Sequence, residues 1–192
     1  MNKPKIISIS GIDGSGKTTQ INHLKEYFDS INLKSEILKV KYLPFHKMKN
    51  LSLTIDDLRM LMAKDFVDYY NKRIKELFDY DYLLCDRSKA CLLAYGLSYG
   101  LKNPDNIWDL LKETQDPDLL FYFDIDPLLS IERISKNRTE FEEDETIENL
   151  KRTRMYYSKV FNDYDFNPVC INASEQEEEI TKKLVLSIKK LN

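Results

Sequence analysis

The sequence has 192 residues, of which 42 % are hydrophobic and 32 % charged; this is the composition of a globular protein with the length of one domain. Its 29 basic and 32 acidic side chains give a net charge of −3, whereas proteins that bind nucleic acid polymers usually carry a basic excess. No apolar run has the length of a membrane span, and the first residues lack a signal-peptide pattern. We therefore expect a cytoplasmic protein with neither a nucleic acid nor a membrane as partner.

Strand-like apolar runs alternate with helical patterns along the whole chain. The runs predicted to be strands lie at 6–9, 35–40, 82–85, 119–123 and 169–171. Helices are predicted at 16–30, 56–78, 89–101, 106–113, 146–162 and 175–191, with one more starting at Asp126 and Pro127, which suit an N-cap and a first helical position. This alternation predicts a single α/β domain over 1–192, in three layers, with helices on both faces of a five-stranded parallel sheet. Ligands of such folds bind at the carboxyl ends of the strands.

A glycine-rich loop between the first strand and the first helix carries the strongest functional signal. Gly11-Ile12-Asp13-Gly14-Ser15-Gly16-Lys17-Thr18 matches the phosphate-binding loop (P-loop) pattern G-x-x-x-x-G-K-[ST]. The glycines allow backbone N–H groups to point inward at phosphate oxygens, and the following helix adds its positive N-terminal end. We expect Lys17 to reach the β- and γ-phosphates of ATP and Thr18 to bind Mg²⁺. The residues expected to bind the nucleotide are Gly11, Asp13, Gly14, Ser15, Gly16, Lys17, Thr18 and Thr19.

A second pair of charged residues follows the predicted strand at 82–85. Asp86 and Arg87 should emerge at the carboxyl end of the sheet, beside the P-loop. A carboxylate in that place can help to bind Mg²⁺, and an arginine can bridge the donor and acceptor phosphates. The chain has no guanine-reading Asn-Lys-x-Asp segment, and its length favours a small kinase over a motor or a helicase.

These motifs and their neighbours resemble the thymidylate kinase family, whose members convert dTMP to dTDP with ATP. The matching segments are 9–20, Asp86-Arg87 with Ala94-Tyr95, 117–127, Arg152-Thr153-Arg154 with Tyr157, and Asn172-Ala173-Ser174. The resemblance covers nearly the whole chain and implies a P-loop NTPase fold, a small-molecule nucleotide acceptor, ATP and Mg²⁺ as cofactors, and a homodimer. It also implies that Asp13 lies near the acceptor sugar hydroxyl and that residues 172–174 back the adenine.

The family's mobile lid would fall at about 136–145 of this chain. Some family members carry a catalytic arginine in the P-loop and others carry it in the lid. The P-loop here has none, so Arg133 and Arg138 become the candidates for arginines that close over ATP. A lid arginine can neutralise charge in the transition state once closure has excluded water.

The predicted acceptor pocket departs from the family. A phenylalanine that stacks on thymine and an arginine four residues later are expected, but the two possible registers give Met62 with Phe66, or Phe66 with Tyr70. The base-reading arginine is missing in both. The substrate contacts proposed from the sequence are therefore Asp13, Pro44, Phe66, Tyr70, Arg87, Tyr95 and Tyr157, with His46 or Lys47 as further contacts to the acceptor phosphate.

The sequence favours transfer of the γ-phosphoryl group of ATP to an acceptor phosphate, most simply that of dTMP. Loss of a base-reading hydrogen bond can change the discrimination between bases, so a different or modified pyrimidine nucleotide is an alternative acceptor. Asp86-Arg87-Ser88 also resembles the motif of deoxynucleoside kinases, in which the acid acts as a base on the 5′-hydroxyl. A nucleotide-binding protein without acceptor chemistry is the third alternative.

Overall fold

The computed structural model describes residues 3–40, 53–137 and 145–191 of the chain. The predicted contacts of Pro44, His46, Lys47 and Arg138 lie outside these residues, as does most of the predicted lid at 136–145. None of the described helices is long and apolar enough to cross a membrane.

The five predicted strands form one sheet in which every neighbouring pair is parallel. They are β1 (Lys5–Gly11), β2 (Ser35–Leu38), β3 (Tyr82–Asp86), β4 (Leu119–Asp124) and β5 (Val169–Asn172). The order across the sheet is β2-β3-β1-β4-β5, so β1 lies in the centre. The structure thus confirms the predicted α/β fold with a five-stranded parallel sheet.

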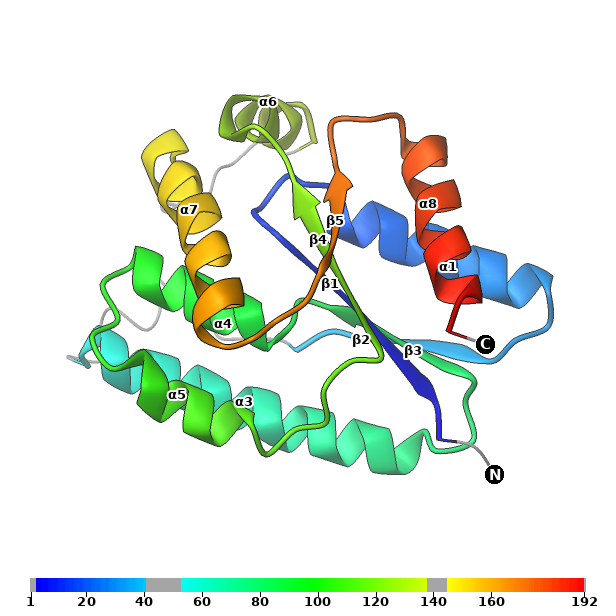
Figure 1. Cartoon of the computed structure of the whole chain (residues 1–192), viewed down its shortest axis with the longest axis horizontal. Helices are drawn as coiled ribbons and strands as arrows, with labels where there is room; N and C mark the ends of the chain where they lie inside the picture. The colour runs from blue at the N-terminus through cyan, green and yellow to red at the C-terminus, as the bar shows by residue number, and fades with distance from the viewer. Residues whose placement is uncertain (1–2, 41–52, 138–144, 192) are drawn as a thin grey trace.

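Helices cover both faces of this sheet. They are α1 (Lys17–Ser30), α3 (Ile55–Glu76), α4 (Lys89–Ser98), α5 (Pro104–Leu111), α6 (Pro127–Asn137), α7 (Ile147–Asp163) and α8 (Glu177–Lys189). In Figure 1, α1 and α8 lie side by side on one face and α3, α4, α5 and α7 lie on the other. The helix α6 lies beyond the carboxyl ends of β4 and β5 (Figure 1).

Local signals in the sequence explain where several helices begin and end. Asp126 caps α6 as predicted, because its carboxylate accepts a hydrogen bond from the Leu128 N–H at 2.7 Å. Thr54 starts α3 through a capping box with Asp57. The predicted helix at 89–101 ends earlier, at Ser98, because Gly100 adopts a left-handed φ of 92° and turns the chain away.

The sheet interior is apolar on both faces. Ile6, Ile7 and Ile9 of β1 and Leu83 and Leu84 of β3 are buried in the hydrophobic core. Strands that are mostly apolar are typical of a parallel sheet covered by helices on both sides, and β1 also buries Ser8 and Ser10. Because the strands are parallel, the polar residues that follow them meet at one edge of the sheet.

Candidate active site

The P-loop joins the end of β1 to the start of α1 and has a backbone that only glycines adopt readily. Gly11, Gly14 and Gly16 have φ values of 150°, 74° and 88°. A Cβ atom on Gly14 would lie 2.6 Å from the carbonyl oxygen of Ser130 in α6. The Ser130 hydroxyl in turn donates a hydrogen bond to the Asp13 carbonyl. The loop is therefore held by α6 at a distance that leaves no room for a side chain.

Lys17 starts α1 and folds back over the loop. Its ammonium group donates a hydrogen bond to the Ile12 carbonyl at 2.8 Å and lies 4.0 Å from Oδ1 of Asp13. The side chain is buried, and burial lowers the pKa of Lys17 although the charge of Asp13 opposes this effect. The lysine thus lies across the concave side of the loop, toward which its N–H groups are expected to point.

Asp13 binds two side chains from the β3–α4 region. Its Oδ1 accepts a hydrogen bond from Nη2 of Arg87 at 2.6 Å, and its Oδ2 accepts one from the Tyr95 hydroxyl at 2.8 Å. Burial alone would raise the pKa of Asp13, but the charges of Arg87 and Lys17 and the Tyr95 hydrogen bond outweigh it and hold this pKa far below its usual value. Asp13 is therefore an anion in the folded protein at neutral pH.

Arg87 has an unusual backbone for an arginine. Its φ of 86° lies in the left-handed region, and its N–H donates to the Ile9 carbonyl of β1 at 3.1 Å. The guanidinium carbon lies 5.1 Å from the centre of the Tyr95 ring, in cation–π geometry. The nearby Asp13 carboxylate raises the pKa of Arg87 well above its usual value. This strained turn aims the guanidinium at the P-loop.

Asp86 ends β3 and meets two groups at one of its oxygens. Its Oδ2 accepts a hydrogen bond from the Thr18 hydroxyl at 3.2 Å and lies 2.9 Å from the Lys39 ammonium. Burial would raise the pKa of Asp86, but the Lys39 hydrogen bond and the charge of Lys17 outweigh it, so this pKa is lowered. Sequence reasoning missed Lys39. The signal that could have found it is the parallel register, in which Leu38 pairs with Cys85 and brings the next residues side by side.

The oxygen atoms of Thr18 and Asp86 fit the ligand preference of Mg²⁺, which binds hard oxygen donors. Among the described residues there is no group of three or more histidine, cysteine, aspartate or glutamate side chains that could hold a metal ion. Mg²⁺ in phosphate-binding sites is commonly held by one or two protein ligands together with substrate phosphates and water. The pair therefore suits a metal that arrives with a nucleotide.

These groups line one cavity of about 380 Å³ at the carboxyl ends of the strands. The P-loop side consists of Asp13, Gly14 and residues 16–19. Lys39, Asp86 and Arg87 line it from the ends of β2 and β3, and Arg133 from α6. Nη1 of Arg133 donates a hydrogen bond to the Ala173 carbonyl at 2.9 Å, so it reaches the loop after β5. The structure thus brings most of the predicted donor-site residues together with Asp86 and Arg87, whereas Gly11 and Ser15 do not line the cavity.

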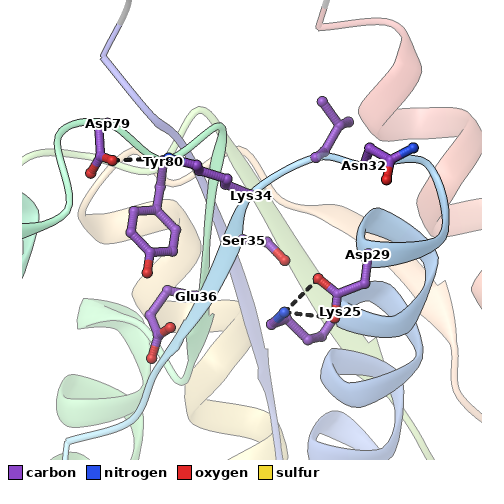
Figure 2. A pocket seen from close by; sticks show the side chains of 9 residues that line it. Lys25, Asp29, Asn32, Lys34, Ser35, Glu36, Asp79 and Tyr80 are labelled. Carbon is purple, nitrogen blue, oxygen red and sulfur yellow. Dashed lines mark hydrogen bonds and ion pairs between the residues drawn. The ribbon is translucent and has the colours of Figure 1, made fainter.

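A second cavity of about 510 Å³ lies at the opposite edge of the sheet, where β2 and β3 begin (Figure 2). Its lysines are already paired: Lys25 binds Asp29 at 2.6 Å and Lys34 binds Asp79 at 3.1 Å. Ligands of parallel α/β sheets bind at the carboxyl ends of the strands rather than at this edge. The P-loop cavity is therefore the candidate active site.

Two predicted base contacts lie in the hydrophobic core. Phe66 and Tyr70 of α3 are 2 % and 4 % exposed, and their rings stack with centroids 4.4 Å apart. Their contact with an acceptor base therefore stays a prediction from the sequence. Their spacing on a helix did not distinguish a core face from a binding face.

Tyr157 of α7, predicted to contact the acceptor, contacts the first residue of the P-loop. Its side chain is fully buried, and its hydroxyl lies 3.3 Å from the nitrogen and 3.2 Å from the oxygen of Gly11. It also donates to Sγ of Cys91 at 3.0 Å. Neither Tyr157 nor Tyr95 is among the residues that line the cavity, but Tyr95 bonds Asp13, which does line it.

The P-loop cavity lies within a region of the chain that matches a known protein family. A family model for thymidylate kinase matches residues 9–184 of the chain. The chain belongs to the thymidylate kinase family. The matched region contains the P-loop, Asp86 and Arg87, and Arg133. Membership makes the protein a phosphotransferase of the nucleoside monophosphate kinase class, and this family uses ATP and typically Mg²⁺.

Curated thymidylate kinases match over almost their full length. The "Probable thymidylate kinase 1" of Saccharolobus solfataricus is 27 % identical over 193 residues, which cover 97 % of each chain. The thymidylate kinase of Francisella tularensis subsp. holarctica is 25 % identical and covers 97 % of this chain and 96 % of its own. That of Bacillus cereus is 28 % identical, with 95 % and 96 % covered. The family resemblance seen in the motifs is thereby confirmed.

Proposed function

We propose that this member of the thymidylate kinase family transfers the γ-phosphoryl group of ATP to the phosphate of dTMP, with dTDP and ADP as products. The observation that carries the proposal is the cavity in which the P-loop meets Asp86 and Arg87. In-line phosphoryl transfer needs positioning and charge neutralisation more than covalent chemistry from the protein. Lys17 and Arg87 supply two positive charges to this cavity, and Asp13 holds both in place.

On the donor side, the P-loop N–H groups and Lys17 bind the phosphates of ATP. The Thr18 hydroxyl and the Asp86 carboxylate are the groups that would hold Mg²⁺. When bound, the metal neutralises phosphate oxygens of the nucleotide. Arg133, fixed to the Ala173 carbonyl, reaches the loop that backs the adenine by family resemblance. Arg138 stays a candidate for the catalytic lid arginine.

On the acceptor side, Asp13 orients the sugar hydroxyl and Arg87 binds the acceptor phosphate. The hydrogen bond from Tyr95 to Asp13 supports this role, because it fixes a carboxylate that lines the cavity. Phe66 and Tyr70, which are buried in this structure, stay predicted base contacts, and Pro44 stays a candidate beside them. A homodimer, which the family resemblance implies, and a cytoplasmic location, which the composition suggests, belong to the same proposal.

A deoxynucleoside kinase would use Asp86 as a base on the 5′-hydroxyl of its acceptor. One observation argues against that role. Ser88, which completes the rival motif, is buried, caps α4 by accepting a hydrogen bond from the Ala90 N–H, and bonds the Ser10 hydroxyl at 2.7 Å. We therefore favour a monophosphate as acceptor.

The variant Lys17→Ala tests the donor half of this site. Loss of the ammonium group that neutralises the transferring phosphoryl group should lower kcat for dTMP phosphorylation by at least about 10²-fold. Lys25→Ala is the matched control, because Lys25 lies on the same helix in an ion pair with Asp29, away from the cavity. Near-normal turnover by Lys17→Ala, measured as ADP release, would contradict the assignment.

A further inference from the structure

Lys39 follows β2, and the pairing of β2 with β3 places it beside the Asp86 carboxylate. In the parallel register Leu38 pairs with Cys85, so the residues after them emerge together at the carboxyl edge. The Lys39 ammonium lies 2.9 Å from Oδ2 of Asp86. The Asp86 side chain is 5 % exposed whereas that of Lys39 is 56 % exposed. A flexible lysine thus reaches from solvent onto a buried carboxylate.

The oxygen that Lys39 contacts is the one that also binds Thr18. Oδ2 of Asp86 accepts the Thr18 hydroxyl at 3.2 Å, and a carboxylate oxygen has two lone pairs. With Thr18 on one side and Lys39 on the other, this oxygen is saturated. A divalent cation placed between Thr18 and Asp86 would meet the Lys39 ammonium at repulsive range.

The other cations near Asp86 are less able to move. Lys17 is buried and bonded to the Ile12 carbonyl, and Arg87 is bonded to Asp13 at 2.6 Å. Lys39 has a long, half-exposed side chain, and among the described contacts its only ion pair is with Asp86. It is therefore the cation that can leave the carboxylate when another one arrives.

We propose that Lys39 is a positioning residue. Its ammonium group stays on Oδ2 of Asp86, where Mg²⁺ would bind, until a metal–nucleotide complex displaces it. In the empty enzyme the ammonium neutralises Asp86 and excludes free divalent cations. The nucleotide phosphates bring negative charge into the cavity that Lys39 lines, so the ammonium transfers to them and frees Asp86. Metal binding and nucleotide binding are thereby coupled. This inference rests on the proposed roles of Thr18 and Asp86.

The direct test measures Mn²⁺ binding to the nucleotide-free, full-length protein by electron paramagnetic resonance. Lys39→Met should bind Mn²⁺ about tenfold more tightly than the wild type, since a competing charge has been removed. Lys39→Arg, which keeps the charge, should retain the weak binding of the wild type. Lys34→Met is the control, because Lys34 forms its ion pair with Asp79 at the opposite edge of the sheet.

Two further measurements locate the effect and separate it from turnover. Adding Asp86→Asn to Lys39→Met should abolish the gain in Mn²⁺ affinity, and in saturating ADP the advantage of Lys39→Met should disappear. Unchanged Mn²⁺ affinity in Lys39→Met would overturn the proposal, as would a gain that survives Asp86→Asn or persists in full with ADP. None of these binding measurements depends on dTMP phosphorylation, so failure of the proposed activity would be seen separately.

Discussion

Asp13 is the residue through which the donor and acceptor halves of the cavity are joined. One carboxylate oxygen binds Arg87, the other binds Tyr95, and Lys17 lies within ion-pair distance. A hydrogen bond to a charged partner contributes more than one between neutral groups. Asp13 therefore stabilises the folded protein as well as ordering the site.

This stabilisation should depend on pH in a defined direction. The pKa of Asp13 is lowered from its usual 3.8 in the folded state, so its contribution is complete above that value and is lost as pH falls toward the lowered pKa. Asp13→Asn should lower the free energy of unfolding by about 2 kcal/mol at pH 7, and the difference should shrink below about pH 4.

Urea unfolding of wild type and Asp13→Asn between pH 3 and 7 measures this difference. Asp29→Asn serves as the control, because Asp29 forms an exposed ion pair with Lys25 on α1. This substitution should lower the free energy of unfolding by less than about 1 kcal/mol. A difference between wild type and Asp13→Asn that grows on acidification would contradict the proposed charge state.

At the level of elements, α6 and the P-loop pack so closely that a side chain at position 14 would clash with α6. A Cβ atom there would lie 2.6 Å from the Ser130 carbonyl, and its φ of 74° is unfavourable for other residues. Gly14→Ala should destabilise the protein by about 1–3 kcal/mol more than Gly100→Ala. Gly100 also has a positive φ, 92°, but no atom within 4 Å of its Cβ position, so it isolates the backbone strain from the clash.

Urea unfolding and calorimetric titration with an ATP analogue measure the two effects of Gly14→Ala. We expect lost stability together with weakened nucleotide binding, because the displaced loop no longer presents its N–H groups to phosphate. Equal stability of Gly14→Ala and Gly100→Ala would show that α6 does not confine the loop as the structure indicates.

The helix α7 supports the P-loop through one hydroxyl group. Tyr157→Phe removes the contacts with Gly11 and leaves that buried backbone without them, which should cost about 1–2 kcal/mol of stability. The KM for ATP should rise by up to about tenfold if the loop loosens by the same energy. Steady-state kinetics and thermal unfolding check both numbers.

Tyr164→Phe is the matched control for Tyr157→Phe. The Tyr164 hydroxyl bonds Asp105 at 2.8 Å on the surface, and neither residue lines the cavity. This control should leave the KM for ATP unchanged. An ATP KM in Tyr157→Phe equal to that of the wild type would mean that the hydroxyl contributes only to folding.

The elements also show which parts of the site were readable from the sequence. The P-loop was predictable because its strand, glycines and helix are contiguous, so local chemistry fixes the arrangement. Asp86 and Arg87 were predictable because they end a buried strand of a parallel sheet. Lys39 was missed because its position follows from the pairing of β2 with β3, which no local pattern reveals.

The aromatic residues mark the limit of the same reasoning. Phe66, Tyr70 and Tyr157 have the residue types of a base-binding pocket, but an aromatic ring on a helix suits a core equally well. Which face of α3 or α7 turns inward depends on packing against the rest of the molecule. Periodicity therefore located the helices while leaving the use of each ring undecided.

At the scale of the whole molecule, one parallel sheet collects the chemistry at one edge. The residues after β1, β2 and β3 line the cavity directly, and Arg133 of α6 links it to the loop after β5. Segments that are distant in the sequence thus supply positive and negative charges to one site. The residues that this edge brings together are those proposed to bind ATP, Mg²⁺ and the acceptor phosphate.

The choice of acceptor distinguishes a dTMP kinase from the alternative kinases. A coupled assay of ADP release with ATP and Mg²⁺ should compare dTMP with thymidine, dUMP and dCMP at equal concentrations. The proposal predicts saturable ADP release with dTMP and the highest kcat/KM for it, with little release for thymidine. Efficient phosphorylation of thymidine, a clear preference for another monophosphate, or no release with any acceptor would contradict it.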